Sequence, residues 1–301
     1  LYDLLHELGL TGIPFGHFGE GCVHIRISFD FSTEDGMATY RTFIERAARL
    51  VHRYGGSVSG EHGDGRARSE LLPLMYSPEA VAAMAAVKAV LDPRDLLNPG
   101  VLVRPRPFDA DLRRTMARPV SGRLGFRYPE DGGDLTSAVH RCTGIGRCVA
   151  DNTGAGGVMC PSWLATRDEK DTTRGRSRVL QEAVNGTLVR GLSSPEVREA
   201  LDLCLACKGC ASDCPTGVDM ATYKAEALHQ RLLDSIDGTA LAKAELLNPP
   251  GDGPHARFLA FRSPRAAQWQ QALKERNCVT DVRGDVLRVG LGLYHDEDDV
   301  D

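Results

Sequence analysis

Four cysteines in one short segment are the residues of this chain with the most definite chemistry. They follow the spacing C-x2-C-x2-C-x3-C-P and are Cys204, Cys207, Cys210 and Cys214. Thiolates at this spacing bind iron–sulfur clusters, and the fourth of them serves a second cluster. A zinc ribbon would place its second cysteine pair a dozen or more residues away, and thiols so close in sequence pair poorly as disulfides. The segment therefore predicts an iron–sulfur site.

Three cysteines upstream follow a stretched version of this motif, in which the second place is changed and the last cysteine lies further along the chain. Cys142, Cys148 and Cys160 take the first, third and fourth places, and Ile145 takes the second. In two-cluster ferredoxins the fourth cysteine of each motif binds the other cluster. The first expected site, for a complete 4Fe–4S cluster, consists of Cys204, Cys207, Cys210 and Cys160. The second expected site consists of Cys142, Cys148 and Cys214.

The second expected site lacks a fourth cysteine, because the side chain of Ile145 cannot bind iron. Three interpretations stay open: a 3Fe–4S cluster, a 4Fe–4S cluster with another ligand such as His140, or no second cluster at all. We favour two clusters, of which the second is unusual.

Two glycine-rich segments contain another group of residues, which could bind a metal ion. The first contains His17 and His24, and the second contains Glu61 and His62. Flanking glycines let the backbone adopt positive φ and leave room for a ligand. Two histidines and a carboxylate, here His17, His24 and Glu61, can bind a metal ion with an open coordination position. The alternative is that these histidines are structural groups near turns.

Periodicity indicates the elements that must position these groups. Residues 22–31 alternate between apolar and polar side chains, which predicts a strand with His24 and Arg26 on its polar face. Residues 35–54 repeat apolar side chains at helical spacing, and Ser77 begins a further helix. Strand, helix, strand and helix in this order predict an α+β fold with helices on one side of a sheet, and Glu61 at the end of the second strand.

Composition predicts the organisation of the chain. Its 301 residues, 42% hydrophobic and 26% charged, indicate a globular protein of about two domains. We expect a linker rich in Pro, Arg and Gly between an α+β domain and a mainly helical domain that holds the cysteines. The expected segments are 1–103 (substrate and metal domain), 104–138 (linker), 139–245 (4Fe–4S ferredoxin-type domain) and 246–301 (an extension with an acidic tail).

Charge and hydropathy exclude some classes of partner. The net charge of −5 gives no reason to expect nucleic acid, and no apolar run reaches the ~20 residues of a transmembrane helix. Cysteines at metal-type spacing predict a reducing, cytoplasmic location, with a peripheral position at the inner membrane face as an alternative. Because Leu1 opens directly inside an expected helix, we expect a piece of a longer polypeptide.

Three segments of the expected α+β domain carry a family resemblance. Residues 16–24, 56–66 and 96–100 read Gly-His-Phe-Gly-Glu-Gly-Cys-Val-His, Gly-Ser-Val-Ser-Gly-Glu-His-Gly-Asp-Gly-Arg and Leu-Leu-Asn-Pro-Gly. In this order they resemble the C-terminal domain of FAD-linked oxidases, and in particular the branch of D-lactate, glycolate and D-2-hydroxyglutarate dehydrogenases. The resemblance covers 1–103 and implies a ferredoxin-like plait.

The resemblance also implies roles for individual residues. His17, His24 and Glu61 would bind a divalent metal, usually zinc, and His62 would be the base that takes the hydroxyl proton of a 2-hydroxy acid. Asn98 would lie near the flavin, and the FAD would be held largely by sequence upstream of Leu1. Arg26, on the same strand face as His24, can bind a substrate carboxylate through a bidentate pair.

The cysteine region has a resemblance of its own. Residues 158–169 and 172–178 resemble the iron–sulfur module of fused flavin and iron–sulfur dehydrogenases, and of the separate iron–sulfur subunit of glycolate oxidase. This resemblance covers about 139–235. Its arginines, Arg174, Arg176 and Arg178, can neutralise anionic clusters, dock a partner or form a solvated helix face, and these alternatives stay open.

These observations together predict an oxidoreductase. The expected reaction is FAD-dependent oxidation of a D-2-hydroxy acid, with electrons passing from flavin through the clusters to a quinone or an electron carrier. One alternative is an iron–sulfur electron-transfer protein that turns over no substrate, and another is an inactive truncated product. The histidine and glutamate group favours the enzyme, because an electron carrier has no use for it.

Overall fold

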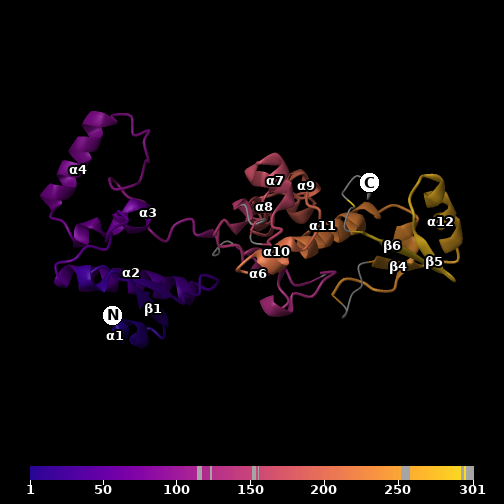
Figure 1. Ribbon diagram of the computed structural model, residues 1–301, viewed down its shortest axis with the longest axis horizontal. Coiled ribbons are helices and arrows are strands. Elements are labelled where there is room, and N and C mark those ends of the chain that lie inside the picture. Colours follow the sequence, from indigo (N-terminus) through magenta and orange to yellow (C-terminus); the bar gives the residue numbers. More distant parts are fainter. Residues whose placement is uncertain are drawn as a thin grey trace. The chain divides into compact units, whose positions relative to one another are not determined.

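The computed structural model describes residues 1–113, 117–122, 124–150, 154, 156–251, 258–292 and 295. The chain divides into two compact units, Leu1–Met116 and Ala117–Asp301, each of which is considered by itself (Figure 1). The division falls within the segment expected to be a linker, 104–138. The acidic tail, 296–301, lies outside the described residues.

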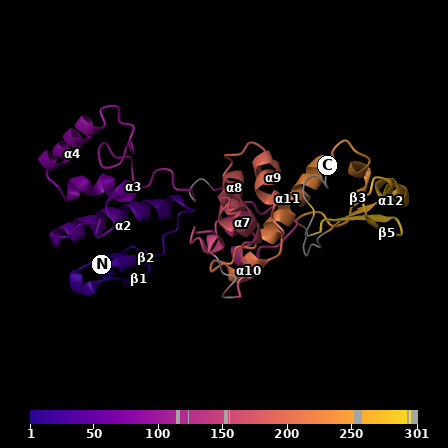
Figure 2. The ribbon, with the colours of Figure 1, turned by 45° about the horizontal axis from the view of Figure 1, so that its top comes forward.

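The first unit combines a two-stranded sheet with helices (Figure 2). Strands β1 (Gly12–Phe15) and β2 (His24–Ile27) pair antiparallel, with Phe15 opposite His24. The helices are α1 (Tyr2–Glu7), α2 (Glu34–Arg53), α3 (Gly65–Arg68) and α4 (Pro78–Leu91), and the 3-10 turns are η1 (Phe18–Glu20) and η2 (Ser69–Leu74).

Helix α2 is the central element of this unit. The Thr33 side chain caps its first turn by accepting a hydrogen bond from the Gly36 N–H. One side of the helix buries Phe43 against α1 and β2, and another buries Ala48 in a cluster with Leu71 and Phe108. The helix expected over 35–54 is therefore present, and it holds the sheet and the later segments of the unit together.

The sheet of the first unit is smaller than the sequence predicts. The expected second strand before Glu61 is wrong, because residues 57–62 form turns in which Gly60 has a φ of 50°, a conformation that a strand excludes. Among residues 1–113 the sheet has two strands, fewer than the four of a ferredoxin-like plait. The strand expected over 22–31 is shorter as well and ends at Ile27.

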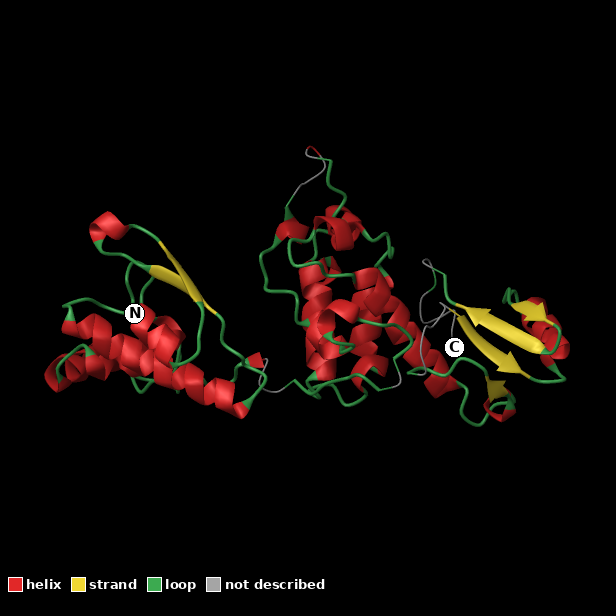
Figure 3. Ribbon diagram, turned by 90° about the horizontal axis from the view of Figure 1, so that it is seen from below, coloured by secondary structure: helices red, strands yellow, loops and turns green. Residues whose placement is uncertain are grey.

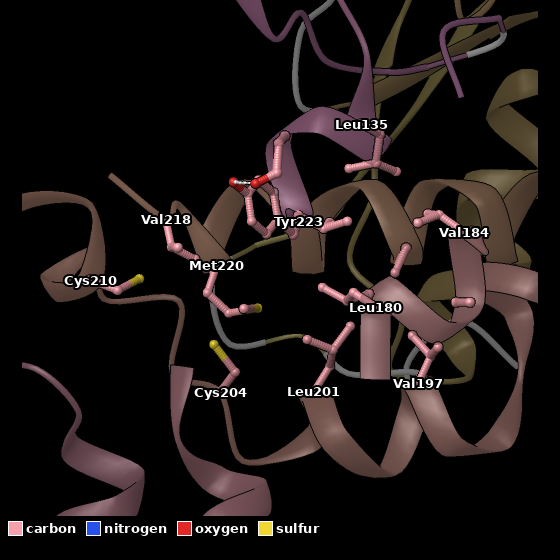
Figure 4. Close-up of a cluster of buried hydrophobic side chains, with 14 of the residues drawn as sticks. Leu135, Leu180, Val184, Val197, Leu201, Cys204, Cys210, Val218, Met220 and Tyr223 are labelled. Atoms are coloured by element: carbon pink, nitrogen blue, oxygen red, sulfur yellow. Dashed lines mark hydrogen bonds between the residues drawn. The ribbon is translucent and has the colours of Figure 1, made fainter. Parts of the chain in front are cut away.

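The second unit begins with a helical core (Figure 4). Its helices are α6 (Leu135–Val139), α7 (Pro161–Thr166), α8 (Thr173–Val184), α9 (Pro195–Asp202), α10 (Gly209–Asp213) and α11 (Met220–Ser235). Its 3-10 turns are η3 (Pro129–Asp131), η4 (Arg147–Val149), η6 (Glu169–Asp171), η7 (Gly191–Ser193) and η8 (Leu241–Lys243). Leu180 and Leu201 are buried in the centre of this core, and Cys204 and Cys210 lie at its edge.

The segment expected to be a simple extension, 246–301, instead contributes most of a second sheet (Figure 3). Strands β3 (Glu245–Leu246), β4 (Phe258–Arg262), β5 (Asp281–Arg283) and β6 (Val286–Gly290) form an antiparallel sheet in the order β3-β4-β6-β5, and α12 (Ala266–Glu275) joins β4 to β5. Leu259 and Phe261 of β4 are buried against Leu232 of α11, so the sheet is packed onto the helical core. No described helix has both the length and the apolar character needed to cross a membrane.

Candidate functional site

Three of the expected site residues of the first unit meet in space. The Nε2 atoms of His24 and His62 lie 3.1 Å and 3.3 Å from the same Glu61 carboxylate oxygen, Oε1. One ligand atom of each of the three residues falls within 4.8 Å of the other two. Two imidazoles and a carboxylate are the donors of a divalent metal site, so these residues fit such an ion.

Local structure explains how these side chains converge. The pairing of β1 and β2 places the Phe15 ring against His24, with ring centroids 5.3 Å apart and nearly parallel. Gly16 follows with a φ of 132°, and a Cβ there would lie 2.8 Å from Cδ2 of His24. The turns at 57–64 then carry Glu61 and His62 to the same end of the hairpin. All three side chains keep access to solvent, since even His24 is 26% exposed.

The remaining predicted residues of this unit lie elsewhere. His17 precedes η1 and does not belong to the group of three. Arg26 is exposed on β2, and its guanidinium carbon lies 5.7 Å from the centroid of the Phe15 ring that stacks on His24. Asn98 occupies a turn with a φ of 47°. The ligand role of His17, the base role of His62 and the substrate and flavin roles of Arg26 and Asn98 stay predictions.

The four cysteines expected for the first cluster line one hollow of about 330 Å³ that opens to solvent. Cys160 precedes α7, Cys204 follows α9, and the other two lie at the start of α10 and just before it. The segments are distant in sequence, yet packing of the helical core brings their sulfurs to one place. Four thiolates around one hollow fit the donor set of a 4Fe–4S cluster.

The three cysteines of the second expected site line another hollow, of about 280 Å³. Cys142, Cys148 and Cys214 are joined there by Ile145, whose side chain is largely exposed. His140 is not among the lining residues, and its Nδ1 lies 2.7 Å from the Thr136 carbonyl oxygen. Hydroxyl-bearing residues, Thr143, Thr173 and Thr216, line the hollow instead. Met159 and Thr173 line both hollows, so the two sites are adjacent.

Burial controls the protonation of the cysteine sulfurs. It raises the pKa of Cys210 to about 12 and raises the pKa of Cys148 as well. It also raises the pKa of Cys204, against the opposing charges of Arg176 and Lys224. For Cys214, burial would raise the pKa, but hydrogen bonds from Thr216 and from nearby backbone N–H groups outweigh it and lower the pKa. Burial therefore makes Cys148, Cys204 and Cys210 harder to deprotonate, and metal binding would favour their thiolate forms.

The three arginines whose roles the sequence leaves open differ in burial and in hydrogen-bond partners. Arg174 forms a partly exposed ion pair with Glu169, with 2.7 Å between Nε and Oε1. Arg178 donates a hydrogen bond to Gln181. Arg176 is fully buried and lines the first hollow, so it does not belong to a solvated helix face. Lys224 of α11 is buried as well, and its Nζ donates a hydrogen bond to the Cys204 carbonyl at 2.9 Å. The sequence around Lys224 does not indicate that this side chain is buried.

Two family models match the chain. Residues 1–102 match the model described as FAD linked oxidases, C-terminal domain, and residues 138–218 match that of the 4Fe-4S dicluster domain. The first match contains the histidine and glutamate group, and the second contains all seven cysteines of the two hollows. No solved structure matches the chain.

Curated relatives are similar to the chain over between a third and four fifths of its length. A D-2-hydroxyglutarate dehydrogenase of Pseudomonas putida is 31% identical over 75% of this chain and 25% of its own length. One of Escherichia coli is 27% identical over 82% of this chain and 28% of its own length. A probable mitochondrial D-lactate dehydrogenase of Danio rerio is 40% identical over 33% of this chain and 20% of its own length. The chain thus spans a quarter or so of the length of these relatives.

Proposed function

We propose a function from the premise that this chain joins an FAD-linked oxidase C-terminal domain to a 4Fe-4S dicluster domain. In our proposal it is part of a flavin- and iron–sulfur-dependent oxidoreductase that oxidises a D-2-hydroxy acid. Relatives that are similar to 75% and 82% of this chain are D-2-hydroxyglutarate dehydrogenases. The substrate class is carried over from the names of these relatives.

The observation that carries this proposal is the shared Glu61 carboxylate oxygen between His24 and His62. His24 and Glu61 would hold a divalent metal, such as zinc, with His17 as the predicted third ligand. The metal would lower the pKa of a substrate hydroxyl bound to it. His62, which lies beside Glu61 and is more exposed than His24, would then take that proton as a general base.

Other residues would position the substrate and receive the electrons. Arg26 lies on the His24 face of β2 and would bind the substrate carboxylate, while Asn98 would lie near the flavin. The FAD would accept hydride from the substrate carbon. The cysteines of the two hollows would hold clusters that carry the electrons onward to a quinone or an electron carrier.

The test is the substitution His62→Ala in the full-length polypeptide that contains the flavin domain. Loss of a general base should lower the rate of D-2-hydroxyglutarate or D-lactate oxidation by about 10²–10⁴-fold, measured with an artificial electron acceptor. The iron–sulfur EPR signals should be unchanged. His52→Ala, an exposed histidine in the last turn of α2, is the matched control and should retain turnover. Wild-type turnover in His62→Ala would rule out His62 as the base, whereas no turnover in the unmodified polypeptide would favour the electron-transfer protein.

A further inference from the structure

A fully buried arginine contacts a cysteine of the first hollow. Arg176, 1% exposed, approaches the Cys160 sulfur with Nη1 at 3.5 Å. Its other polar contacts hold the guanidinium in place, since Nη1 donates to the Asp171 carbonyl at 2.6 Å, Nη2 to the Ser162 hydroxyl at 3.0 Å and Nε to the Ala200 carbonyl at 2.8 Å. The side chain is therefore fixed with one N–H group directed at an expected cluster ligand.

A second buried cation lies behind the same hollow. Lys224 of α11 is 4% exposed, and its Nζ donates to the Cys204 carbonyl at 2.9 Å and to the Asp202 carbonyl at 3.3 Å. A buried carboxylate, Asp171, partly balances the charge of Arg176, with its Oδ1 3.8 Å from Nη2. Two buried cations thus lie close to Cys160 and Cys204, two ligands of the first expected cluster.

The second hollow differs in this respect. The described arginines that line it are Arg147, which is exposed, and Arg174, which is partly exposed and paired with Glu169. Water screens such charges, whereas charges inside a protein interact more strongly because the local dielectric is lower. The first hollow is therefore the one beside which two cations, Arg176 and Lys224, are buried away from water.

Burying a cation costs several kcal/mol unless it is compensated, and an anionic cluster beside Arg176 and Lys224 would add to that compensation. A cluster held by four thiolates is a dianion when oxidised and a trianion after it gains one electron, with no proton taken up. Net charge and hydrogen bonds to the sulfurs set the potential of such a cluster. A fixed cation that also donates a hydrogen bond to a ligand sulfur stabilises the added electron through its charge and through that hydrogen bond.

We propose that Arg176 and Lys224 are positioning residues that raise the reduction potential of the cluster held by Cys160, Cys204, Cys207 and Cys210. Their charges make this cluster a better acceptor for electrons that arrive one at a time from a reduced flavin. The inference rests on the iron–sulfur part of the proposed function and is independent of the substrate.

The test is a potentiometric titration of the cluster-loaded chain, with dithionite as the reductant and EPR as the readout. Arg176→Gln removes the charge but keeps a donor, and we expect at least a tenfold lower equilibrium constant for reduction, a shift of about 59 mV to more negative potential. Arg176→Lys keeps the charge and should lie closer to the wild type. Lys224→Met should shift the potential in the same direction as Arg176→Gln.

Two further variants test the direction of the shift in reduction potential. Asp171→Asn removes the buried anion and should shift the potential to more positive values. Arg174→Gln, on the partly exposed arginine, should leave the first cluster unchanged. If Arg176→Gln does not retain iron, the inference is tested by Lys224→Met and Asp171→Asn, which should shift the reduction potential in opposite directions. Unchanged potentials in variants that retain the cluster, or equal shifts in Arg176→Gln and Arg176→Lys, would overturn the inference. A wild-type chain that binds no cluster would overturn the iron–sulfur assignment itself.

Discussion

At the scale of single residues, the two kinds of candidate site differ in their exposure. Glu61 and His62 are about half exposed, at 44% and 56%, so ligands from solvent can reach them. Cys204 and Cys210 are buried at the edge of the helical core, where a cluster would be partly shielded from water. An exposed carboxylate site suits an exchanging substrate, and a buried thiolate site suits a permanent electron carrier.

Glu61→Gln should weaken metal binding in the first unit. The amide keeps the shape of the carboxylate but removes the charge that attracts a divalent cation, so we expect at least a ~10-fold loss of Mn²⁺ affinity. Mn²⁺ is the probe because it prefers carboxylate ligands to thiolates, and EPR of free Mn²⁺ measures its binding. Glu20→Gln, on the exposed turn η1, is the control, and equal affinities in both variants would contradict the site.

Ile145→Cys should complete the second cluster site. The residue lines the hollow together with Cys142, Cys148 and Cys214, so a cysteine there supplies the fourth thiolate of the motif. We expect slower loss of iron to a chelator than in the wild type, and a change in the EPR signal of this cluster alone. Ile145→Val is the matched control. Iron loss at the wild-type rate in Ile145→Cys would show that this position does not face the cluster.

At the scale of elements, helical periodicity separates the three arginines of α8. Two residues rotate a helix by about 200°, so Arg174 and Arg178 share one side and Arg176 lies on the opposite side. The helical period alone does not indicate which side of α8 is buried. The packing of α8 against α9 and the cysteine loops decides this, and the Thr172 cap, which accepts a hydrogen bond from the Gly175 N–H at 2.7 Å, sets where the helix begins.

Helix α2 shows how an element secures a loop. Arg41 of this helix donates to Asp109, with 2.6 Å between Nε and Oδ2, and also to Glu70. The guanidinium lies over the Phe108 ring, 4.4 Å from its centroid. The hydrogen bonds from Arg41 lower the pKa of Asp109 below its ordinary value of 3.8. The segment around Asp109 is therefore held to α2 by a charge that acid removes.

Asp109→Asn should destabilise the first unit in a pH-dependent way. Because the folded-state pKa of Asp109 is lowered, its stabilisation is complete well above pH 3.8 and is lost as the pH falls through the folded-state value. We expect a loss of about 1–2 kcal/mol at pH 7, and a smaller difference from the wild type at pH 3. Urea denaturation at the two pH values measures the difference in the free energy of unfolding between the variant and the wild type. Asp111→Asn, on a carboxylate that is 55% exposed, should have less effect at pH 7.

At the scale of the whole molecule, each candidate site is built within one unit. The group of His24, Glu61 and His62 lies in Leu1–Met116, and both cysteine hollows lie in Ala117–Asp301. Metal binding and cluster binding should therefore be independent of each other.

Cys210→Ser tests this independence. The substitution removes a thiolate from the first hollow, so the EPR signal of that cluster should be lost, while the Mn²⁺ affinity of the first unit stays at its wild-type value. The reciprocal variant, Glu61→Gln, should leave the iron content unchanged. A loss of Mn²⁺ affinity in Cys210→Ser would show that the two units depend on each other.

The sequence by itself determined the chemistry that is available: which cysteines and histidines occur, their spacing, and the helices and turns that carry them. Local spacing is enough for these features, because caps, periodicity and turn glycines act within a few residues. Only the tertiary structure decided that Arg176 is buried and Arg174 is not, that Glu61 lies on a turn, and that the chain after residue 245 forms a sheet. These outcomes depend on packing between residues that are far apart in sequence, and no local pattern encodes which neighbour a side chain will meet.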